Sequence, residues 1–194
     1  MSATDIDRVE VDLCLACERS EQDCRDWREL QVAVYGPSDQ RRLGLSARLS
    51  WAAIEPDVSW VLQVRVDGRL VSYLWIIERT ILIDGAPTRA AGIRGVMTHP
   101  DYRRHGFGRI AMQRAAEFTW HAVRPDLALL LSSVMAVPFY QRLGWQTIHG
   151  PVLCAQPGGQ VSYTEVIPEA PAMVLVPPGG HLPHGVVDLC GLPW

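Results

Sequence analysis

Residues 96–108 read VMTHPDYRRHGFG, and the rest of the chain is interpreted outward from this stretch. It predicts a strand that ends in a loop, followed by the first turn of a helix. A helix N-terminus carries partial positive charge and free backbone N–H groups, so it attracts an anion. Arg103 and Arg104 add two positive charges beside it, and Gly106 and Gly108 let the backbone approach a ligand closely. The stretch therefore predicts a phosphate or pyrophosphate site.

The chain before this stretch is expected to form helices and then antiparallel strands. Ser20 has the position of an N-cap, so a helix is expected from there until Gly36-Pro37. Residues 41–53 are expected to form a second, short helix. Two Asp-Gly pairs predict tight hairpin turns between the strands that follow. Strands are expected at Trp60–Val66, at Arg69–Glu78, at Thr80–Ile83, from Thr88 onward and at Gly92–Thr98.

The chain after this stretch predicts alternating helices and strands. An amphipathic helix is expected over about 106–122, and the uniformly apolar Leu127–Leu131 predicts a strand buried on both faces, as in a partly parallel sheet. Shorter elements are then expected: helix Val137–Leu143, strand Trp145–Ile148, turn-rich Gly150–Pro171 and edge strand Met173–Val176. This order predicts one α+β domain over residues 1–194, with its core at about 25–150 and a C-terminal strand and tail over 151–194.

The composition is that of an ordinary globular domain. The chain has 194 residues and a formal net charge of −3, so bulk electrostatics favour no nucleic-acid partner. No apolar run approaches the roughly 18 residues that a membrane span needs, and the N-terminus shows no secretion signal. The expected location is therefore the cytoplasm, without a membrane partner.

The cysteines argue against a disulfide framework, because there are 5 of them and an odd number cannot all pair. Cys14 and Cys17 have the spacing of half a zinc site or of a redox pair, but no second pair or His cluster completes it. Free thiols and no metal site are expected.

Two motifs in sequence order resemble those of the GNAT (Gcn5-related N-acetyltransferase) superfamily. Val96–Gly108 resembles its motif A, and Pro138–Tyr140 followed by Gly144-Trp145 resembles its motif B. The resemblance covers about residues 25–150. It implies the GNAT fold, a mixed and mostly antiparallel sheet with flanking helices and a splayed pair of parallel strands at the coenzyme A (CoA) site. It also implies an N-acetyltransferase that uses acetyl-CoA.

The resemblance assigns roles to residues of both motifs. Backbone groups of Val96, Met97 and Thr98 are expected to hold the pantetheine arm and to face the thioester oxygen. Tyr140 is expected to protonate the departing thiolate, because a phenol with a pKa of about 10 keeps its proton at a pH where a thiol with a pKa of about 8.5 loses its own. The residues expected to hold the pyrophosphate are Arg103, Arg104, His105, Gly106, Phe107 and Gly108.

Within the superfamily, the sequence is most similar to the aminoglycoside 2′-N-acetyltransferases, through Leu131–Ser133, His149–Pro151 and the final Trp194. It departs from them at Arg94, where those enzymes carry a glutamate that helps to bind a polycationic drug. An arginine repels a polycation, so amines with a carboxylate or with one positive charge are expected to be better acceptors. The expected substrate-binding residues are Arg94, Glu169 and Ser132. Arg94 is expected to pair with a loop carboxylate or with a carboxylate of the substrate.

The general base is left open. His99, beside Pro100, is expected to be a turn residue, and Glu165 and Glu169 lie in the loop where the similar enzymes place a substrate-binding acid. Trp194 is expected to pack against the domain. Its terminal carboxylate then either anchors or deprotonates the incoming amine, or the tail only covers an apolar patch.

Three functions are compatible with these motifs. The first is an N-acetyltransferase acting on a primary amine of a small molecule, with aminoglycoside-type antibiotics among the candidates. The second is transfer of a longer acyl chain to an amino sugar, and the third is a module that binds acyl-CoA without turnover. The oligomeric state is left open, with a homodimer as one option.

Overall fold

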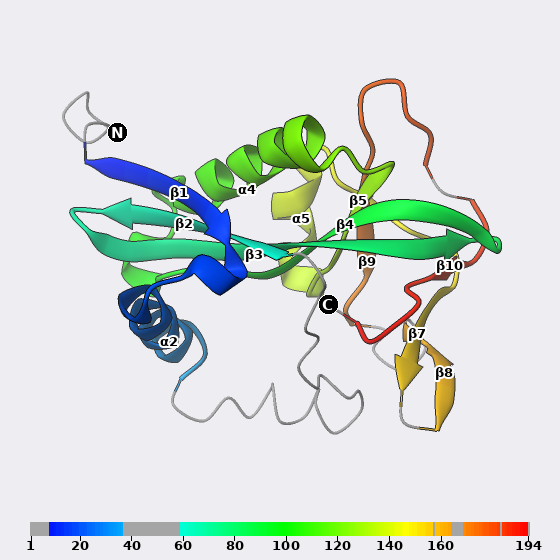
Figure 1. Cartoon of the computed structure of the whole chain (residues 1–194), viewed down its shortest axis with the longest axis horizontal. Coiled ribbons are helices and arrows are strands. Elements are labelled where there is room, and N and C mark those ends of the chain that lie inside the picture. The colour runs from blue at the N-terminus through cyan, green and yellow to red at the C-terminus, as the bar shows by residue number, and fades with distance from the viewer. Residues whose placement is uncertain (1–7, 37–58, 157, 164–168, 183, 194) are drawn as a thin grey trace.

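The computed structural model describes residues 8–36, 59–156, 158–163, 169–182 and 184–193. The strands of this part are β1 (Val9–Leu15), β2 (Ser59–Val66), β3 (Arg69–Ile83), β4 (Ala86–Thr98), β5 (Leu127–Leu131), β6 (Gln146–Thr147), β7 (Val152–Gln156), β8 (Gly159–Ser162), β9 (Ala172–Leu175) and β10 (Val187–Asp188). They form one mixed sheet in the order β6-β9-β5-β4-β3-β10-β7-β8, and the pair β1–β2 also joins at β3. Helices α2 (Glu21–Tyr35) and α4 (Phe107–Phe118) cover opposite faces of this sheet (Figure 1). The α+β prediction is confirmed.

A long meander of β2, β3 and β4 forms the centre of the sheet. The Asp-Gly pairs at its two turns, 67–68 and 84–85, have φ between 48° and 80°, as type I′ hairpin turns require. The expected division of β3 and of β4 into shorter strands is wrong. Antiparallel pairing between β3 and β4 continues from residue 72 to the second turn, so both strands run unbroken through the expected interruptions.

Helix α2 begins and ends where the sequence predicts. The Ser20 hydroxyl accepts the backbone N–H of Asp23 at 3.1 Å, and the Asp23 carboxylate accepts the N–H of Ser20 at 2.9 Å. Gly36, with φ of 83°, caps the other end. The helix expected over 41–53 lies outside the described residues. Strand β1 was not predicted, although its sequence VEVDLCL alternates between apolar and polar residues as a half-buried strand does.

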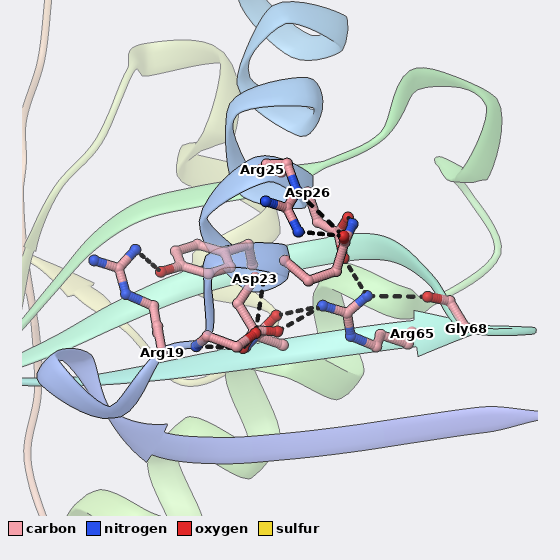
Figure 2. A network of polar contacts seen from close by, with 10 residues as sticks. Arg19, Asp23, Arg25, Asp26, Arg65 and Gly68 are labelled. Carbon is pink, nitrogen blue, oxygen red and sulfur yellow. Dashed lines mark hydrogen bonds and ion pairs between the residues drawn. The ribbon is translucent and has the colours of Figure 1, made fainter.

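Ion pairs fix α2 to the sheet. Arg65 of β2 donates to Asp23 at 2.9 Å and to Asp26 at 2.6 Å, both on α2 (Figure 2). The three side chains are only 13% to 23% exposed. The hydrogen bond from Ser20 lowers the pKa of the Asp23 carboxyl, and Gln63 and Arg65 add to this effect. Because loss of one partner would leave a buried charge unpaired, these contacts hold the first turn of α2 against β2.

The second half of the chain completes both sides of the sheet. Strand β5 is buried between β4, which it pairs in parallel, and β9, which it pairs antiparallel, so the prediction of a central strand is confirmed. The expectation that residues 173–176 form an edge strand is wrong, because β6 pairs with the outer side of β9. Short helix α5 (Val137–Gln141) lies where a helix was expected. Strands β7 and β8 form a hairpin, which was not predicted, within the stretch expected to be rich in turns.

Candidate functional site

Strands β4 and β5 diverge at the centre of the sheet. Among the described residues they pair only over 90–93 and 127–130. Just beyond, β4 contains a bulge, in which Gly95 and Val96 together lie opposite the single residue Leu74 of β3. Gly95 has φ of 59°, which glycine adopts at little cost. The bulge turns the end of β4 away from β5, in agreement with the splayed pair that the sequence resemblance implies.

The turn from β4 to α4 presents backbone N–H groups. Arg104 and Gly106 have φ of 66° and 92°, and such left-handed residues within a turn direct successive N–H groups towards one point. The first hydrogen bond of α4 runs from the N–H of Ile110 to the carbonyl of Gly106 at 2.9 Å. The N–H groups of residues 107–109 therefore have no carbonyl partner within the helix. A Cβ on Gly106 would find open space, with Arg109 Nη2 nearest at 3.9 Å.

Basic side chains surround these N–H groups. Arg103, Arg104 and His105 are all exposed. Arg103 donates through Nε to the carbonyl of Thr98 at 3.3 Å, and no ion pair joins Arg103 or Arg104 to a carboxylate in the described part of the chain. Phe107 is only 7% exposed, so it offers a ligand its N–H group but not its ring. The turn thus combines directed N–H groups with positive charge, which fits a pyrophosphate.

Gly108 lets α4 start close to the end of β4. A Cβ at this position would lie 3.0 Å from Thr98 Oγ1 and 3.7 Å from Phe139 Cζ. The Thr98 hydroxyl is itself 3.1 Å from that of Ser72, which donates to the carbonyl of Met97 at 2.7 Å. Packing between helix and strand therefore explains this glycine, whereas backbone conformation explains Gly106.

Tyr140, the expected acid, lies on α5 directly after Phe139, whose Cζ is 3.7 Å from the position of a Cβ on Gly108. It is 7% exposed, and its ring packs edge-on against Phe139 and Trp145 with centroids 5.1 and 6.3 Å apart. Burial raises the pKa of Tyr140, with a smaller contribution from Tyr35 of α2. The phenol therefore keeps its proton at neutral and moderately alkaline pH, where it can serve as a general acid.

His99 is a turn residue, as expected. Its Nδ1 accepts the N–H of Asp101 at 3.3 Å, and its Nε2 lies 3.0 Å from Arg69 Nη2. Tyr102 packs edge-on against the ring at a centroid distance of 5.7 Å. Because both ring nitrogens are engaged, the structure favours no catalytic role for His99.

Aromatic and basic side chains gather on the α2 face of the sheet. Trp75 of β3 lies opposite Arg94 of β4, and the Arg94 guanidinium carbon is 5.8 Å from the centroid of the Trp75 ring. Arg19, which precedes α2, places its guanidinium carbon 4.6 Å from the same ring and 5.9 Å from that of Trp27. Arg19 also donates to the hydroxyl of Tyr73 at 3.4 Å. Of these residues, only Arg94 was expected from the sequence to belong to the substrate-binding site.

The segments that contain Ser132 and Glu169 are hydrogen-bonded to each other near the end of β5. The N–H of Ser132 donates to the carbonyl of Pro171 at 3.0 Å, and the N–H of Val134 donates to that of Glu169 at 3.2 Å. Ser132 is 4% exposed and its hydroxyl donates to its neighbour's carbonyl, which favours a structural role. The Glu169 side chain is exposed. Glu165 lies outside the described residues.

The C-terminal tail is anchored as far as Pro193, which is buried. Arg79 of β3 donates to the carbonyls of Leu189 at 3.2 Å and Leu192 at 2.8 Å. Burial lowers the pKa of Arg79, and the charge of Arg94 contributes to this shift. Trp194 lies outside the described residues, and its role stays a prediction.

The five cysteines are all free. Within the described ranges, no three His, Cys, Asp or Glu side chains come close enough to hold a metal ion. No helix in these ranges has both the length and the apolar character needed to cross a membrane.

The profile of the family described as "Acetyltransferase (GNAT) domain" matches residues 18–148, well over half of the chain. The chain belongs to the GNAT acetyltransferase family. Solved GNAT structures share its fold. ElaA of Escherichia coli has a TM-score of 0.60 and 15% identity, with 86% of this chain and 98% of ElaA covered. YhbS of Escherichia coli, solved with CoA, has a TM-score of 0.59 and 15% identity, with 94% and 90% covered.

A third GNAT structure, from Brucella melitensis, was solved with acetyl-CoA. It has a TM-score of 0.54 and 17% identity, with 92% of this chain and 94% of that protein covered. At these identities the comparisons establish the GNAT fold, and they give no evidence of similarity to aminoglycoside acetyltransferases in particular.

Proposed function

We propose that this GNAT protein transfers the acetyl group of acetyl-CoA to a primary amine of a small molecule. The observation that carries the proposal is the turn over residues 103–108, which directs N–H groups to one point beside two exposed arginines, next to the end of β4 where β4 and β5 no longer pair. On the other side of the sheet, the aromatic and basic face beside Trp75 offers a separate place for the acceptor. Complexes of GNAT relatives with CoA and with acetyl-CoA support the choice of donor.

The turn suits a pyrophosphate for two physical reasons. The N–H groups of residues 107–109 and the partial positive charge of α4 favour an anion at its N-terminus. Arg103 and Arg104 stand beside it on the surface, where bidentate guanidinium–phosphate contacts are geometrically favourable. Backbone groups of residues 96–98, at the bulge and just beyond it, then hold the pantetheine arm as it passes between the diverging strands.

Bound acetyl-CoA supplies a thioester whose carbonyl carbon the amine attacks. N–H groups of residues 96–98 stabilise the negative charge that develops on the carbonyl oxygen. Tyr140 donates its proton to the sulfur as the C–S bond breaks, since its raised pKa keeps the phenol protonated until then. The proton that the amine loses goes to a base that we do not assign.

The positive charge on the acceptor side of the sheet limits the charge of the amine that can bind there. Arg19 and Arg94 bring two guanidinium groups to the Trp75 ring on the α2 face of the sheet. A polycation such as an aminoglycoside is repelled there more strongly than an amine with one positive charge. Arg94→Glu should therefore shift preference towards polycations.

The test is amine-dependent release of the CoA thiol from acetyl-CoA, measured across a panel of amines that includes tobramycin and gentamicin. We expect the protein to acetylate singly charged amines and to acetylate aminoglycosides poorly. Efficient acetylation of aminoglycosides by the wild-type protein would overturn the charge argument. Absence of both acetyl-CoA binding and thiol release would overturn the proposed function.

A further inference from the structure

We propose that Ser72 of β3 is a positioning residue for acetyl-CoA, which sets the alignment between the end of β4 and the N-terminus of α4. The inference rests on the proposed acetyl transfer, in which these two elements bind different parts of one ligand. Residues 96–98 are assigned there to the pantetheine arm, and residues 103–108 to the pyrophosphate. Ser72 is completely buried, with 0% of its surface exposed, so it acts through other residues and not by contact with the ligand.

The single proton of the Ser72 hydroxyl is donated to β4. The hydroxyl oxygen lies 2.7 Å from the carbonyl oxygen of Met97, and a carbonyl can only accept. The second contact of Ser72, with the Thr98 hydroxyl at 3.1 Å, must then use the proton of Thr98. Both hydroxyl protons are thus assigned, and the Thr98 hydroxyl can act towards any further group only as an acceptor.

The Thr98 side chain lies where the end of β4 meets α4. Its Oγ1 is 3.0 Å from the position of a Cβ on Gly108, in the first turn of the helix. Because its proton points to Ser72, the hydroxyl has only lone pairs left for α4, whose N-terminus carries partial positive charge. This orientation of the hydroxyl favours close approach of the helix to the strand.

The backbone of Thr98 is connected both to β3 and to the turn before α4. Its carbonyl accepts Arg103 Nε at 3.3 Å. The N–H of the next residue, His99, donates to the carbonyl of Val71 at 2.8 Å. Since Val71 directly precedes Ser72, β3 holds this part of β4 through its backbone and through the Ser72 side chain. The arginine turn is therefore tied to β3 through Thr98.

Alignment of the two elements matters only for a ligand that spans both of them. Two linked groups bind as one unit only when their sites lie at a matching separation and orientation. Loss of the Ser72 contact would let the end of β4 and α4 shift against each other, although each would keep its own N–H groups. Acetyl-CoA would then bind less tightly, whereas 3′-phosphoadenosine 5′-diphosphate, which has the pyrophosphate but no pantetheine arm, would bind as before.

The experiment measures the Kd of both ligands by isothermal titration calorimetry with the full chain and its variants. Ser72→Ala removes one hydroxyl of the pair, and Thr98→Val removes the other while keeping the shape of the side chain. Each should raise the Kd of acetyl-CoA about three- to tenfold, as loss of one hydrogen bond between neutral groups implies. Each should change the Kd of 3′-phosphoadenosine 5′-diphosphate by less than about twofold. The double variant should bind acetyl-CoA no more weakly than the weaker single variant, since both changes remove the same contact.

Thr119→Val is the matched control. Thr119 is 1% exposed and directly follows the C-terminal end of α4, and its hydroxyl has no hydrogen-bond partner among the described residues. The variant also removes one buried hydroxyl, but it should leave the Kd of acetyl-CoA within about twofold. Thermal unfolding checks that each variant is folded. If Ser72→Ala does not fold, the same comparison of ligands with Thr98→Val decides.

The outcomes separate this inference from the proposed function. Weaker binding of acetyl-CoA alone, without further loss in the double variant, supports the role of Ser72. Unchanged acetyl-CoA affinity in Ser72→Ala and Thr98→Val overturns the inference and leaves acetyl transfer standing. Equal weakening of both ligands also overturns it, because general damage to the site would have that effect. A wild-type protein that binds no acetyl-CoA overturns the proposed function, and this inference with it.

Discussion

Replacing Gly106 with alanine should separate binding from folding at the turn that precedes α4. Gly106 has φ of 92°, and an L residue in a left-handed conformation costs about 1–2 kcal/mol. A Cβ there would meet only Arg109 Nη2, at 3.9 Å, so no steric clash adds to this cost. For a chain of this size the unfolding midpoint should fall by about 2–8 °C.

The same substitution should weaken the binding of acetyl-CoA. Relief of the backbone strain requires Gly106 to leave its left-handed conformation, and this turns neighbouring N–H groups away from the point at which they converge. Loss of one hydrogen bond to a charged phosphate is worth about 1.5–3 kcal/mol, which corresponds to a roughly 10- to 150-fold increase in Kd. Isothermal titration calorimetry with acetyl-CoA measures this directly.

Gly68→Ala is the control for that measurement. Gly68 has φ of 76° in the first hairpin turn, and nothing lies within 4 Å of a Cβ there. Its stability loss should match that of Gly106→Ala, with no change in acetyl-CoA affinity. Similar unfolding midpoints combined with wild-type affinity in both variants would refute the assignment of the turn to the pyrophosphate.

Three further predictions concern catalysis, α2 and the tail. Tyr140→Phe should keep the acetyl-CoA affinity and lower kcat by on the order of 10², and an unchanged kcat would place the acid elsewhere. In the wild type, deprotonation of Tyr140 should cause no loss of kcat below the ordinary tyrosine pKa of 10.0, because burial raises the pKa of this phenol. Arg65→Met should lower the free energy of unfolding by about 3 kcal/mol, because Asp23 and Asp26 lose their partner, and denaturant unfolding that shows under about 1 kcal/mol would contradict this. The Asp23 contribution is present above pH 3.8 and is lost as pH falls through its lowered pKa, so the Arg65→Met difference should shrink there. A few residues appended after Trp194 should leave the fold intact but reduce turnover, and a native rate would exclude a role for the terminal carboxylate.

Local signals in the sequence were sufficient for much of the fold. The N-cap at Ser20, the two Asp-Gly turns and the apolar run of β5 each determine a structure within a few residues, and each lies where it was expected. Strand β1 was not predicted, although its sequence alternates between apolar and polar residues. By contrast, the place of β9 inside the sheet depends on which strands pair with it, and no local pattern encodes that.

The candidate site also has a part that local sequence predicts and a part that depends on packing between distant segments. The turn over 103–108 could be predicted, because a helix N-terminus, glycines and arginines act together within one short segment. Arg19 could not, because its partners Tyr73 and Trp75 are more than fifty positions away and meet it only after α2 packs on the sheet. Gly108 was predicted for phosphate approach, but its close contact with Thr98 shows a packing role as well.

The most direct test of the account is a crystal structure of the protein with acetyl-CoA. The pyrophosphate oxygens are predicted to lie about 2.7–3.2 Å from N–H groups of residues 106–109, with the thioester between the diverging ends of β4 and β5 next to Tyr140. Acetyl-CoA bound with its pyrophosphate elsewhere, or none bound at saturating concentration, would contradict the proposed function.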